Sequence, residues 1–377
     1  MRHGMNRRGF MGVVGAVAGP MILPSRLFGA NAPSNRIALG FIGMGSQGTG
    51  RNMGTFLQQE DAVVRAVCDC RLSSAEKAKG IADKHYGNAD CEVYQDFREV
   101  LERDDLDAIV ISTPDHWHVP LSMAALAAGK DVFSEKPSLT IVEGRRLVEE
   151  VKKRGAVFQW GIEDRSLIKY HRLAGWARCG VIGDLDRIEV RLPRKSPYLK
   201  DAPAAVPADL DWNLWLGPAP WRAYTPTVTQ PQNWRLVTDY SGGSLTDWGA
   251  HLVDTAQVGA RMEHSGPVSV SGTGTILDEA EYQSNTPIDY KLHYTYSNGV
   301  EMDVSDGDID LKFMGTKGWV RCKGWNGTWS ASSDEILRIG EFDKNVIWPR
   351  PEIEHRDFLD AMRSRKAPAY HVEAGHR

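Results

Sequence analysis

The sequence is poor in cysteine and lacks the spacings that cysteine-based sites require. Its 377 residues contain five cysteines, an odd number, and no two of them form a Cys-x-x-Cys pair. Neither a zinc knuckle nor a disulfide framework is supported, and we expect no metal site. A chain of this length buries a large core without cross-links, and its length predicts two or three domains.

A surplus of positive charge is also absent. The net charge is −4 and the isoelectric point is near 6.3, so nothing attracts a nucleic-acid backbone and we expect no nucleic-acid partner. Hydrophobic residues make up 42% and charged residues 25%, which is ordinary for a globular protein and excludes a disordered or multi-span membrane class. The chain has no internal repeat and no low-complexity tract.

The first 32 residues have the pattern of an export signal. Arg7 and Arg8 precede an apolar run over residues 10–23, and Ala-Asn-Ala follows at residues 30–32. As a helix of ~1.5 Å per residue this run would reach about 21 Å, short of the ~30 Å hydrocarbon core. We predict a twin-arginine signal peptide over residues 1–32, which directs the protein to the periplasm through the twin-arginine export machinery. An uncleaved membrane anchor is the alternative.

A glycine-rich turn follows a short apolar run over residues 36–42, which is typical of a buried parallel strand. The turn has the pattern G-x-G-x-x-G and consists of Gly43, Met44, Gly45, Ser46, Gln47 and Gly48. The first glycine permits a tight turn, the second admits a pyrophosphate, and the third lets the helix pack closely on the strand. A helix over residues 49–59 and a second strand over residues 62–67 are predicted next.

Asp69 follows that second strand, 21 residues after Gly48. This is near the spacing of the acidic residue that binds a ribose diol in dinucleotide-binding domains. We therefore predict a site for NAD. Arg71 could instead hold the 2′-phosphate of NADP, so NADP stays possible. A structural glycine turn with a solvated aspartate is the alternative interpretation.

The chain then alternates between strand and helix patterns up to about residue 162, which predicts a doubly wound parallel sheet of the Rossmann type over residues 33–162. For residues 163–377, the strand and helix patterns predict an α/β domain with an open, largely antiparallel sheet and helices on one face. Its strands are expected at residues 188–192, 268–272, 290–296 and 311–314, and its helix at 245–259. Residues 195–232 are rich in Pro and Trp and are expected to form a long ordered loop.

Two segments directly follow predicted strands of the parallel sheet, where α/β folds bind ligands. The first runs from Thr113 and Pro114 to His116 and His118. It is expected beside the cofactor, with one histidine packed on the cofactor and the other capping a helix. A metal-binding pair of histidines is the alternative.

The second segment is Glu135-Lys136-Pro137. The ammonium of Lys136 could point into the crevice and stabilise a developing alkoxide. A surface ion pair between Glu135 and Lys136 is the alternative.

A third segment contains Asp247, His251 and Asp254 at i, i+4 and i+7 of a predicted helix. Residues at this spacing share one helix face. A carboxylate beside an imidazole raises its basicity and fixes its tautomer, which suits a general base near neutral pH. A solvated polar face is the alternative.

Together these motifs resemble the Gfo/Idh/MocA oxidoreductases, relatives of glucose–fructose oxidoreductase and inositol dehydrogenase, in their order and spacing, and most closely the exported bacterial branch. The resemblance implies a Rossmann domain that binds NAD(P) and a C-terminal domain that supports a pocket for a sugar or cyclitol. It also implies a cis bond before Pro137 and a homo-oligomer formed through the C-terminal sheet. The residues it implies for the cofactor are those of the glycine turn, with Asp69, Thr113, Pro114, His118, Glu135 and Lys136.

The resemblance further implies the catalytic groups. His251 takes the proton of a substrate hydroxyl, Lys136 holds the oxygen and Asp247 assists, with Arg165 also contacting substrate. Two departures from the family pattern stand out. Glu163 and Asp164 occupy positions where glutamine is frequent, which should alter substrate preference. The sequence stops at Arg377, where relatives continue into a further helix, so it is interpreted as truncated.

Three functions stay open. The first is a dehydrogenase with exchangeable NAD(P) that oxidises a CH–OH group. The second is a redox-neutral enzyme, either a glycoside hydrolase or a sugar–sugar oxidoreductase, with NAD(H) loaded before export and then retained. The third is a non-catalytic nucleotide- or sugar-binding protein.

Overall fold

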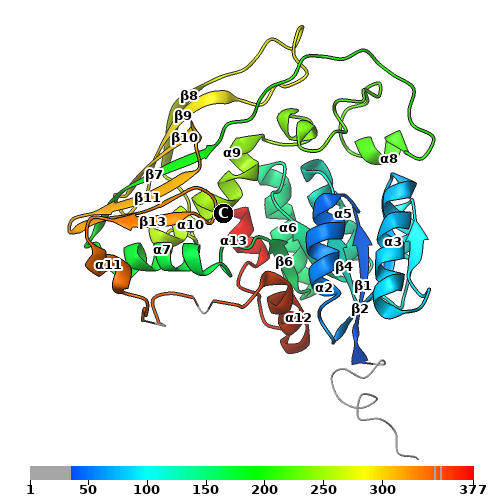
Figure 1. The fold of residues 1–377 in the computed structure, drawn as a ribbon, viewed down its shortest axis with the longest axis horizontal. Helices are drawn as coiled ribbons and strands as arrows, with labels where there is room; N and C mark the ends of the chain where they lie inside the picture. Colours follow the sequence, from blue (N-terminus) through cyan, green and yellow to red (C-terminus); the bar gives the residue numbers. More distant parts are fainter. Residues whose placement is uncertain (1–34, 344, 349) are drawn as a thin grey trace, which may run out of the picture.

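The computed structural model describes residues 35–343, 345–348 and 350–377, and the expected signal peptide lies outside this range. Two sheets lie side by side in the molecule, each with its own helices (Figure 1). Within the described ranges, no helix has the length and apolar composition that crossing a bilayer requires.

The first sheet is parallel throughout, as predicted. Its strands in spatial order are β3 (Glu92–Tyr94), β2 (Ala62–Cys68), β1 (Ile37–Ile42), β4 (Ala108–Ile111), β5 (Asp131–Glu135) and β6 (Phe158–Gly161). The segments that connect them contain η3 (Ser46–Met53), α2 (Gly54–Phe56), α3 (Leu72–Tyr86), α4 (Phe97–Leu101), α5 (Asp115–Ala127) and α6 (Ile141–Arg154).

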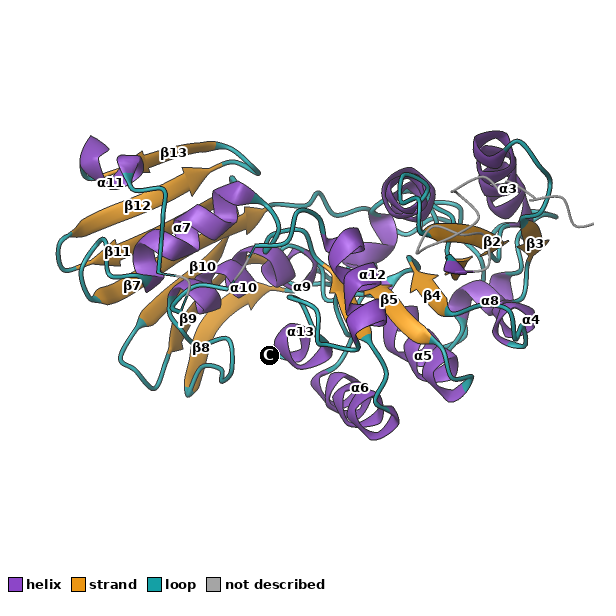
Figure 2. Cartoon of the chain, turned by 90° about the horizontal axis from the view of Figure 1, so that it is seen from below, coloured by secondary structure: helices purple, strands orange, loops and turns teal. Residues whose placement is uncertain are grey.

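The central strands are apolar on both faces because each face is covered by helices. Ile109 and Ile111 of β4 belong to one apolar cluster, while Val110 and its neighbour Phe133 of β5 belong to another. Such alternation between two dry faces is typical of a parallel sheet. Figure 2 shows α12 over β5 on the side opposite α5 and α6.

The glycine turn connects β1 to η3. Gly43 has φ +90°, and a Cβ on it would lie 2.7 Å from the backbone of Ser112. A Cβ on Gly48 would lie 1.9 Å from the carbonyl oxygen of Gly43. Both positions therefore require glycine. The following helix begins at Ser46 with π-helical geometry and ends at Phe56, whereas the sequence predicted one α-helix over residues 49–59.

The second sheet is mixed and largely antiparallel, as expected, because only β7 and β10 run parallel. Its strands in spatial order are β13 (Thr328–Ala331), β12 (Gly318–Lys323), β11 (Asp310–Gly315), β7 (Leu185–Pro193), β10 (Glu301–Gly307), β9 (Ile288–Thr295) and β8 (Ser269–Thr275). The helices α7 (Ile168–Arg178) and α10 (Gly249–Gly259) pack on one face of it (Figure 2).

The helix predicted over residues 245–259 is interrupted. It consists of α9 (Ser244–Asp247) and α10, with Trp248 between them. Because the two pieces are separate, residue spacing across this break does not follow a single helix. This difference matters for the site described below.

The long Pro- and Trp-rich loop returns from the second sheet to the first. Its residues 207–217, here called the strap, include α8 (Trp212–Leu216), which lies near α3 in Figure 1. The strap is hydrogen-bonded to the segment after β2. The amide of Leu72 donates to Asp209 O, and the amide of Asp211 donates to Cys70 O, both at 2.8 Å. A short helix, η4 (Asn233–Leu236), follows the strap.

The end of the chain also returns to the first sheet, which the sequence did not predict. After α11 (Asp334–Arg338), α12 (Glu354–Ser364) and α13 (Val372–His376) pack on its strands and on α6. Phe358 of α12 is fully buried in one core cluster of that sheet, and Tyr370 is buried in the other. The expected domain boundary at residue 162 separates the two family-like halves of the sequence. It does not separate the two hydrophobic cores, because the core of the first sheet also includes residues from the last part of the chain.

Candidate active site

A cavity of about 630 Å³ opens at the carboxyl edge of the parallel sheet, between the glycine turn, the strap and α9–α10. Its size is in the range of ligand-binding pockets. Most of the expected site residues line it: Gly43, Gly45, Ser46, Gln47, Asp69, Thr113, Pro114, His118, Glu135, Lys136, Asp247 and His251. Met44, Gly48 and Arg165 do not belong to its lining.

Asp69 directly follows β2 and fixes the glycine turn at one end of the cavity. Its carboxylate accepts hydrogen bonds from the amide of Met44 at 2.7 Å and from the amide of Arg71 at 2.8 Å. Burial raises the pKa of Asp69, and these amides partly offset that effect. Met44 therefore contributes its backbone amide to the site, while its side chain is buried in the core.

Glu135 is buried and fixes the glycine turn and the helix that follows it. It accepts hydrogen bonds from the side-chain amides of Gln47 at 2.9 Å and Asn52 at 2.8 Å. Burial raises the pKa of Glu135, and the two amides act in the opposite direction. Glu135 and Lys136 therefore do not form a surface ion pair. The bond between Lys136 and Pro137 is cis, as the resemblance implied.

The two histidines after β4 are fixed by backbone carbonyls. His118 lies with Nδ1 2.8 Å from Pro137 O and Nε2 2.8 Å from Thr113 O. His116 contacts Trp215 O through Nε2 at 3.0 Å and packs against the ring of Tyr240. Burial lowers the pKa of both imidazoles to about 4. His118 borders the cavity, while His116 is buried beneath the strap and contacts a carbonyl in the last turn of α8, so it caps a helix as expected of one of the two histidines.

Lys136 and Asp247 form a buried ion pair in the cavity wall. The ammonium donates to Asp247 Oδ1 at 2.6 Å and to the backbone oxygen of the same residue at 2.7 Å. Arg235 lies 3.3 Å from the other carboxylate oxygen. Burial alone would raise the pKa of Asp247, but these two cations outweigh burial and lower it below its usual range. Asp247 is thus an anion that positions the Lys136 ammonium.

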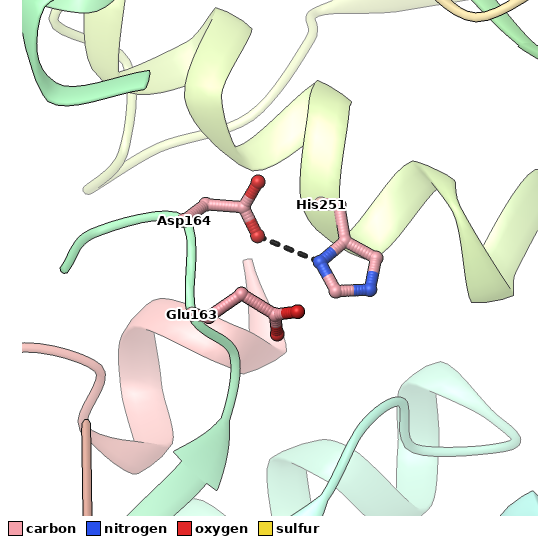
Figure 3. A group of neighbouring side chains, drawn as sticks. All are labelled: Glu163, Asp164 and His251. Carbon is pink, nitrogen blue, oxygen red and sulfur yellow. Dashed lines mark hydrogen bonds and ion pairs between the residues drawn. The ribbon is translucent and has the colours of Figure 1, made fainter. Parts of the chain in front are cut away.

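His251 is paired with Asp164, as Figure 3 shows, and not with Asp247. The Nδ1 atom lies 2.6 Å from Asp164 Oδ2, and the Asp164 side chain is 1% exposed. Burial, followed by the nearby ammonium of Lys136, lowers the pKa of His251 to about 4. The expectation that Asp247 orients this imidazole is therefore wrong, because Lys136 and Arg235 engage the Asp247 carboxylate and Asp164 occupies Nδ1 of His251.

Glu163, Asp164 and His251 form the cluster drawn in Figure 3, and one ligand atom from each lies within 4.8 Å of the others. Three such groups could hold a metal ion. Here, however, the Nδ1 of His251 and one oxygen of Asp164 are engaged with each other. Of the two acids noted in the sequence, Glu163 lines the cavity, while Asp164 is buried behind His251.

Arg165 does not reach the cavity. Its guanidinium pairs with Asp254 at 2.8 and 3.2 Å, donates to Ala369 O at 2.8 Å and lies over the ring of Tyr370. The prediction that Arg165 contacts the substrate is therefore wrong. Arg165 instead connects α10 to the C-terminal segment, because it binds both Asp254 and Ala369. Asp254 is likewise used by Arg165 and does not face the substrate.

Sequence reasoning missed two tryptophans. Trp248 stands in the helix break, and Trp325 lies in the turn between β12 and β13. Both line the cavity beside His251, with ring centroids 5.7 and 5.0 Å from its imidazole. Tryptophan at a turn has no local signature of function, since it equally packs in cores. The tertiary fold alone places Trp325 at the site.

The cavity suits a dinucleotide. A Cβ on Gly45 would meet no atom within 4 Å, so the backbone is open to a pyrophosphate at that position. Gly43 and Gly48, in contrast, are required by the protein's own backbone. Asp69 borders the same cavity, with lone pairs available for a ribose diol. When bound, a nicotinamide would supply the hydride-transferring group.

Solved structures with the same fold include an aldose-aldose oxidoreductase from Caulobacter crescentus in complex with glycerol. It is 18% identical with a TM-score of 0.65, covering 90% of this chain and 93% of that chain. Another is the WlbA dehydrogenase from Bordetella pertussis in complex with NADH and UDP-GlcNAcA. It is 17% identical with a TM-score of 0.63, covering 90% and 92%. At 17–18% sequence identity, these similarities show that the chains share a fold.

Curated relatives match a shorter part of the chain. An alpha-N-acetylgalactosaminidase from Shewanella oneidensis is 27% identical over 178 residues, and a glycosyl hydrolase family 109 protein from Shewanella sp. strain MR-4 is 28% identical over 174 residues. Each match covers 40% of this chain and 38% of the relative.

Two family models account for most of the chain. Residues 37–162 match the oxidoreductase family with an NAD-binding Rossmann fold, and residues 196–377 match the C-terminal alpha/beta domain of the same family. The turn, the Asp69 carboxylate and the parallel sheet agree with the first match, and the mixed sheet agrees with the second. The chain therefore belongs to the Gfo/Idh/MocA family of oxidoreductases.

Proposed function

We propose that this protein is an NAD-dependent oxidoreductase that acts on a CH–OH group of a sugar, glycoside or cyclitol. The observation that carries this proposal is the placement of Lys136 and His251. An ammonium and an imidazole line one cavity in front of the glycine turn, and the ammonium acts electrostatically on the imidazole. The two groups supply a hydrogen-bond donor and a proton acceptor for one alcohol.

His251 accepts the hydroxyl proton at Nε2. Burial favours the neutral imidazole of His251 and also raises the pKa of Asp164. We assign the single imidazole proton to Nδ1, where the ionised form of Asp164 accepts the hydrogen bond. This tautomer leaves the Nε2 lone pair free. Lys136 donates a hydrogen bond to the substrate oxygen as negative charge develops there, and Asp247 keeps the ammonium charged and aimed.

The test is substitution of each group with binding measured separately. Lys136→Met and His251→Ala should abolish turnover on a panel of sugars, while calorimetry shows nucleotide binding within a few-fold of the parent. Activity that survives in both variants would refute the assignment. Intact parent protein that binds nucleotide and sugar but turns over no member of the panel would favour the non-catalytic alternative.

A second candidate function is a redox-neutral cycle with retained nucleotide. The strap favours it, because its hydrogen bonds to Cys70 and Leu72 close the cavity at the end marked by Asp69. A sugar carbon is oxidised, the glycosidic substituent leaves by elimination, water adds, and the carbon is reduced again. The sum is hydrolysis without net oxidation, in line with the names of the curated relatives. Transfer of hydride between two sugars is the other version.

Bound-nucleotide analysis discriminates the two functions. Protein purified without added nucleotide is denatured, and the released nucleotide is quantified per chain. Aryl glycosides are then offered to native protein with no NAD added. Aglycone release without a net change in reduced-nucleotide absorbance supports the redox-neutral cycle. Turnover that requires added NAD and accumulates NADH supports the simple dehydrogenase.

We also propose that residues 1–32 direct export to the periplasm by the twin-arginine route. A folded protein with nucleotide already bound suits that route. The Arg7→Lys, Arg8→Lys double variant should accumulate in the cytoplasm on cell fractionation, while an Arg2→Lys control is exported. Export of the double variant would refute the proposal.

We further propose a homo-oligomer through the second sheet. All seven residues of its edge strand β8 are exposed, with the side chain of Val270 among them. A pairing partner would cover such an edge. Light scattering should give a multiple of the chain mass, and Val270→Lys should reduce it to the monomer mass. A parent protein that is already monomeric would refute the proposal.

A further inference from the structure

The adenosine end of the cavity is built from both halves of the chain. From the first half come Asp69, Cys70 and Arg71, which follow β2, and from the strap come Leu210 and Leu214. Arg71 and Leu210 pair as an isolated antiparallel bridge, and Gln95 donates to Cys70 O at 3.0 Å and lies 3.4 Å from Asp209 O. The strap is thus joined to the loop that would border the ribose of a bound nucleotide.

Arg71 forms an ion pair with the strap in which about a third of each side chain is exposed. Its guanidinium lies 3.3 Å from Asp209 Oδ1, and the hydroxyl of Ser73 donates to Asp209 Oδ2 at 2.5 Å. On the other side, the backbone amide of Arg71 is held by Asp69. Among the described residues that line this end of the cavity, Arg71 is the only cation, and it is faced by two carboxylates.

The charges around Arg71 bear on whether the site binds NAD or NADP. Its 2′-phosphate carries negative charge that a free arginine fork recognises well and that carboxylates repel. NAD presents a neutral hydroxyl at the same position, and this hydroxyl can donate a hydrogen bond to a carboxylate. Asp69 alone would leave the guanidinium of Arg71 free to turn toward a phosphate. Asp209 competes with a phosphate for this guanidinium, and it does so from the C-terminal half of the chain.

We propose that Asp209 determines the preference for NAD over NADP by pairing with Arg71 at the adenosine end of the cavity. The inference concerns nucleotide recognition alone and does not depend on which sugar is the substrate. It assigns to the strap a specificity that sequence reasoning attributed to Asp69 and Arg71 only.

The test uses nucleotide binding to the full-length protein, freed of bound nucleotide. Calorimetry measures NAD, NADP, and the probes AMP and adenosine 2′,5′-bisphosphate for the parent and for Asp209→Asn. The amide keeps the shape and the contact with Ser73 but loses the charge. Because the variant loses an ion pair that competes for Arg71 and that is worth up to about 1 kcal/mol when exposed, NADP and the bisphosphate should bind about fivefold tighter. NAD and AMP should change by less than about threefold.

Two further variants complete the experiment. Arg71→Ala in the Asp209→Asn background should remove the gain for NADP. Asp90→Asn, which removes an exposed carboxylate 3.7 Å from Arg65, controls for a general loss of negative charge and should leave the preference unchanged. Equal NADP affinity in the parent and Asp209→Asn would overturn the proposal. So would a gain that persists without Arg71, or one that Asp90→Asn reproduces.

Discussion

His251 illustrates how one side chain depends on partners from three parts of the chain. Its Nδ1 meets Asp164 from the end of β6, its pKa responds to Lys136 from the end of β5, and Trp325 packs against it from the second sheet. The imidazole is thereby buried, neutral and oriented. Asp164 is a positioning residue, because it acts on the reacting alcohol only through the imidazole.

Replacement of Asp164 tests this role. In Asp164→Asn the amide accepts the Nδ1 hydrogen bond less strongly and can present its NH₂ group, which favours the wrong tautomer. We expect kcat to fall by about a hundredfold or more, by analogy with the loss of an orienting carboxylate, with KM changed little. Asp186→Asn, which changes an exposed aspartate of β7 outside the cavity, is the control and should retain kcat. A loss confined to KM or to the thermal midpoint would contradict the positioning role.

The pH profile is a second prediction about this residue. Burial and Lys136 lower the pKa of His251 from 6.5 to about 4, so the imidazole is neutral above that pH and protonated below it. Since the base acts in its neutral form, kcat/KM should stay constant from neutral pH down to about pH 5 and fall only near pH 4. Stopped assays over this range check it. A fall centred near 6.5 would show an exposed imidazole.

The sequence placed Lys136 and His251 at one site, and both line the cavity, while their catalytic roles stay predictions and their partners were not predicted. The first two stand at strand ends or at a helix start, where a local pattern indicates the crevice. The pairing of Asp247 with His251 rested on their spacing, but Lys136 and Arg235 engage the Asp247 carboxylate. Asp164 and Arg235 are far from their partners in sequence, so no spacing rule could join them.

At the scale of the element, α8 is a helix of five residues that forms part of the cavity wall. Asp211 caps it, because Oδ1 accepts the amide of Leu214 at 2.9 Å, while its own amide donates to Cys70 O. A helix this short has little stability of its own, so its cap and its anchor on the first half matter. Leu214 and Trp215 keep their places only while this turn is intact.

Asp211→Ala is expected to loosen the strap. Loss of the cap costs about 1 kcal/mol, and the nucleotide should dissociate several-fold faster as the wall opens. Asn is an equally good cap, so Asp211→Asn should behave like the parent. Displacement of bound NADH by excess NAD, followed by fluorescence, gives the rates. Identical rates in Asp211→Ala and Asp211→Asn would show that α8 does not retain the nucleotide.

Elements of the first half were predictable because each strand–turn–helix unit is local. The glycine pattern predicts a tight turn. Gly48 is required by its contact with the Gly43 backbone, and Gly43 is required by its contact with the Ser112 backbone after the neighbouring strand β4. The π-helical start of η3 has no such signature. Nor does α8, because Trp212 packs in a cluster with Tyr224, Val237 and Tyr240, which lie further along the chain, and no local pattern in the Pro- and Trp-rich stretch indicates that cluster.

At the scale of the molecule, Asp61 joins the end of the chain to its beginning. It accepts hydrogen bonds from Arg356 at 2.7 and 3.1 Å and from Arg363 at 3.0 Å, both on α12. Burial raises the pKa of Asp61, but the two arginines outweigh burial and hold it below 3.8. The carboxylate therefore stabilises the fold at neutral pH.

Asp61→Asn should lower stability by about 1–3 kcal/mol, a few degrees in Tm, with little effect on kcat. A depressed carboxylate pKa contributes stability above the unfolded value near 3.8, and this contribution is lost as pH falls through the lower folded value. The difference in Tm between parent and variant should therefore shrink below about pH 4. Asp360→Asn, which removes a more exposed partner of Arg356, is the control with a smaller effect. A difference that is independent of pH would refute the ionic explanation.

The return of α12 and α13 to the parallel sheet limits how members of this family can exchange parts. A hybrid that joins residues before the 162–163 boundary to a foreign second half would lose the native Phe358, Tyr370 and Arg363, and with them the packing that completes the first core. Swapping substrate recognition between relatives thus requires the crossover points to bracket residues 163–353 and leave the chain's last helices with the nucleotide-binding half. Recombination libraries built on three segments should yield more soluble hybrids than libraries built on two.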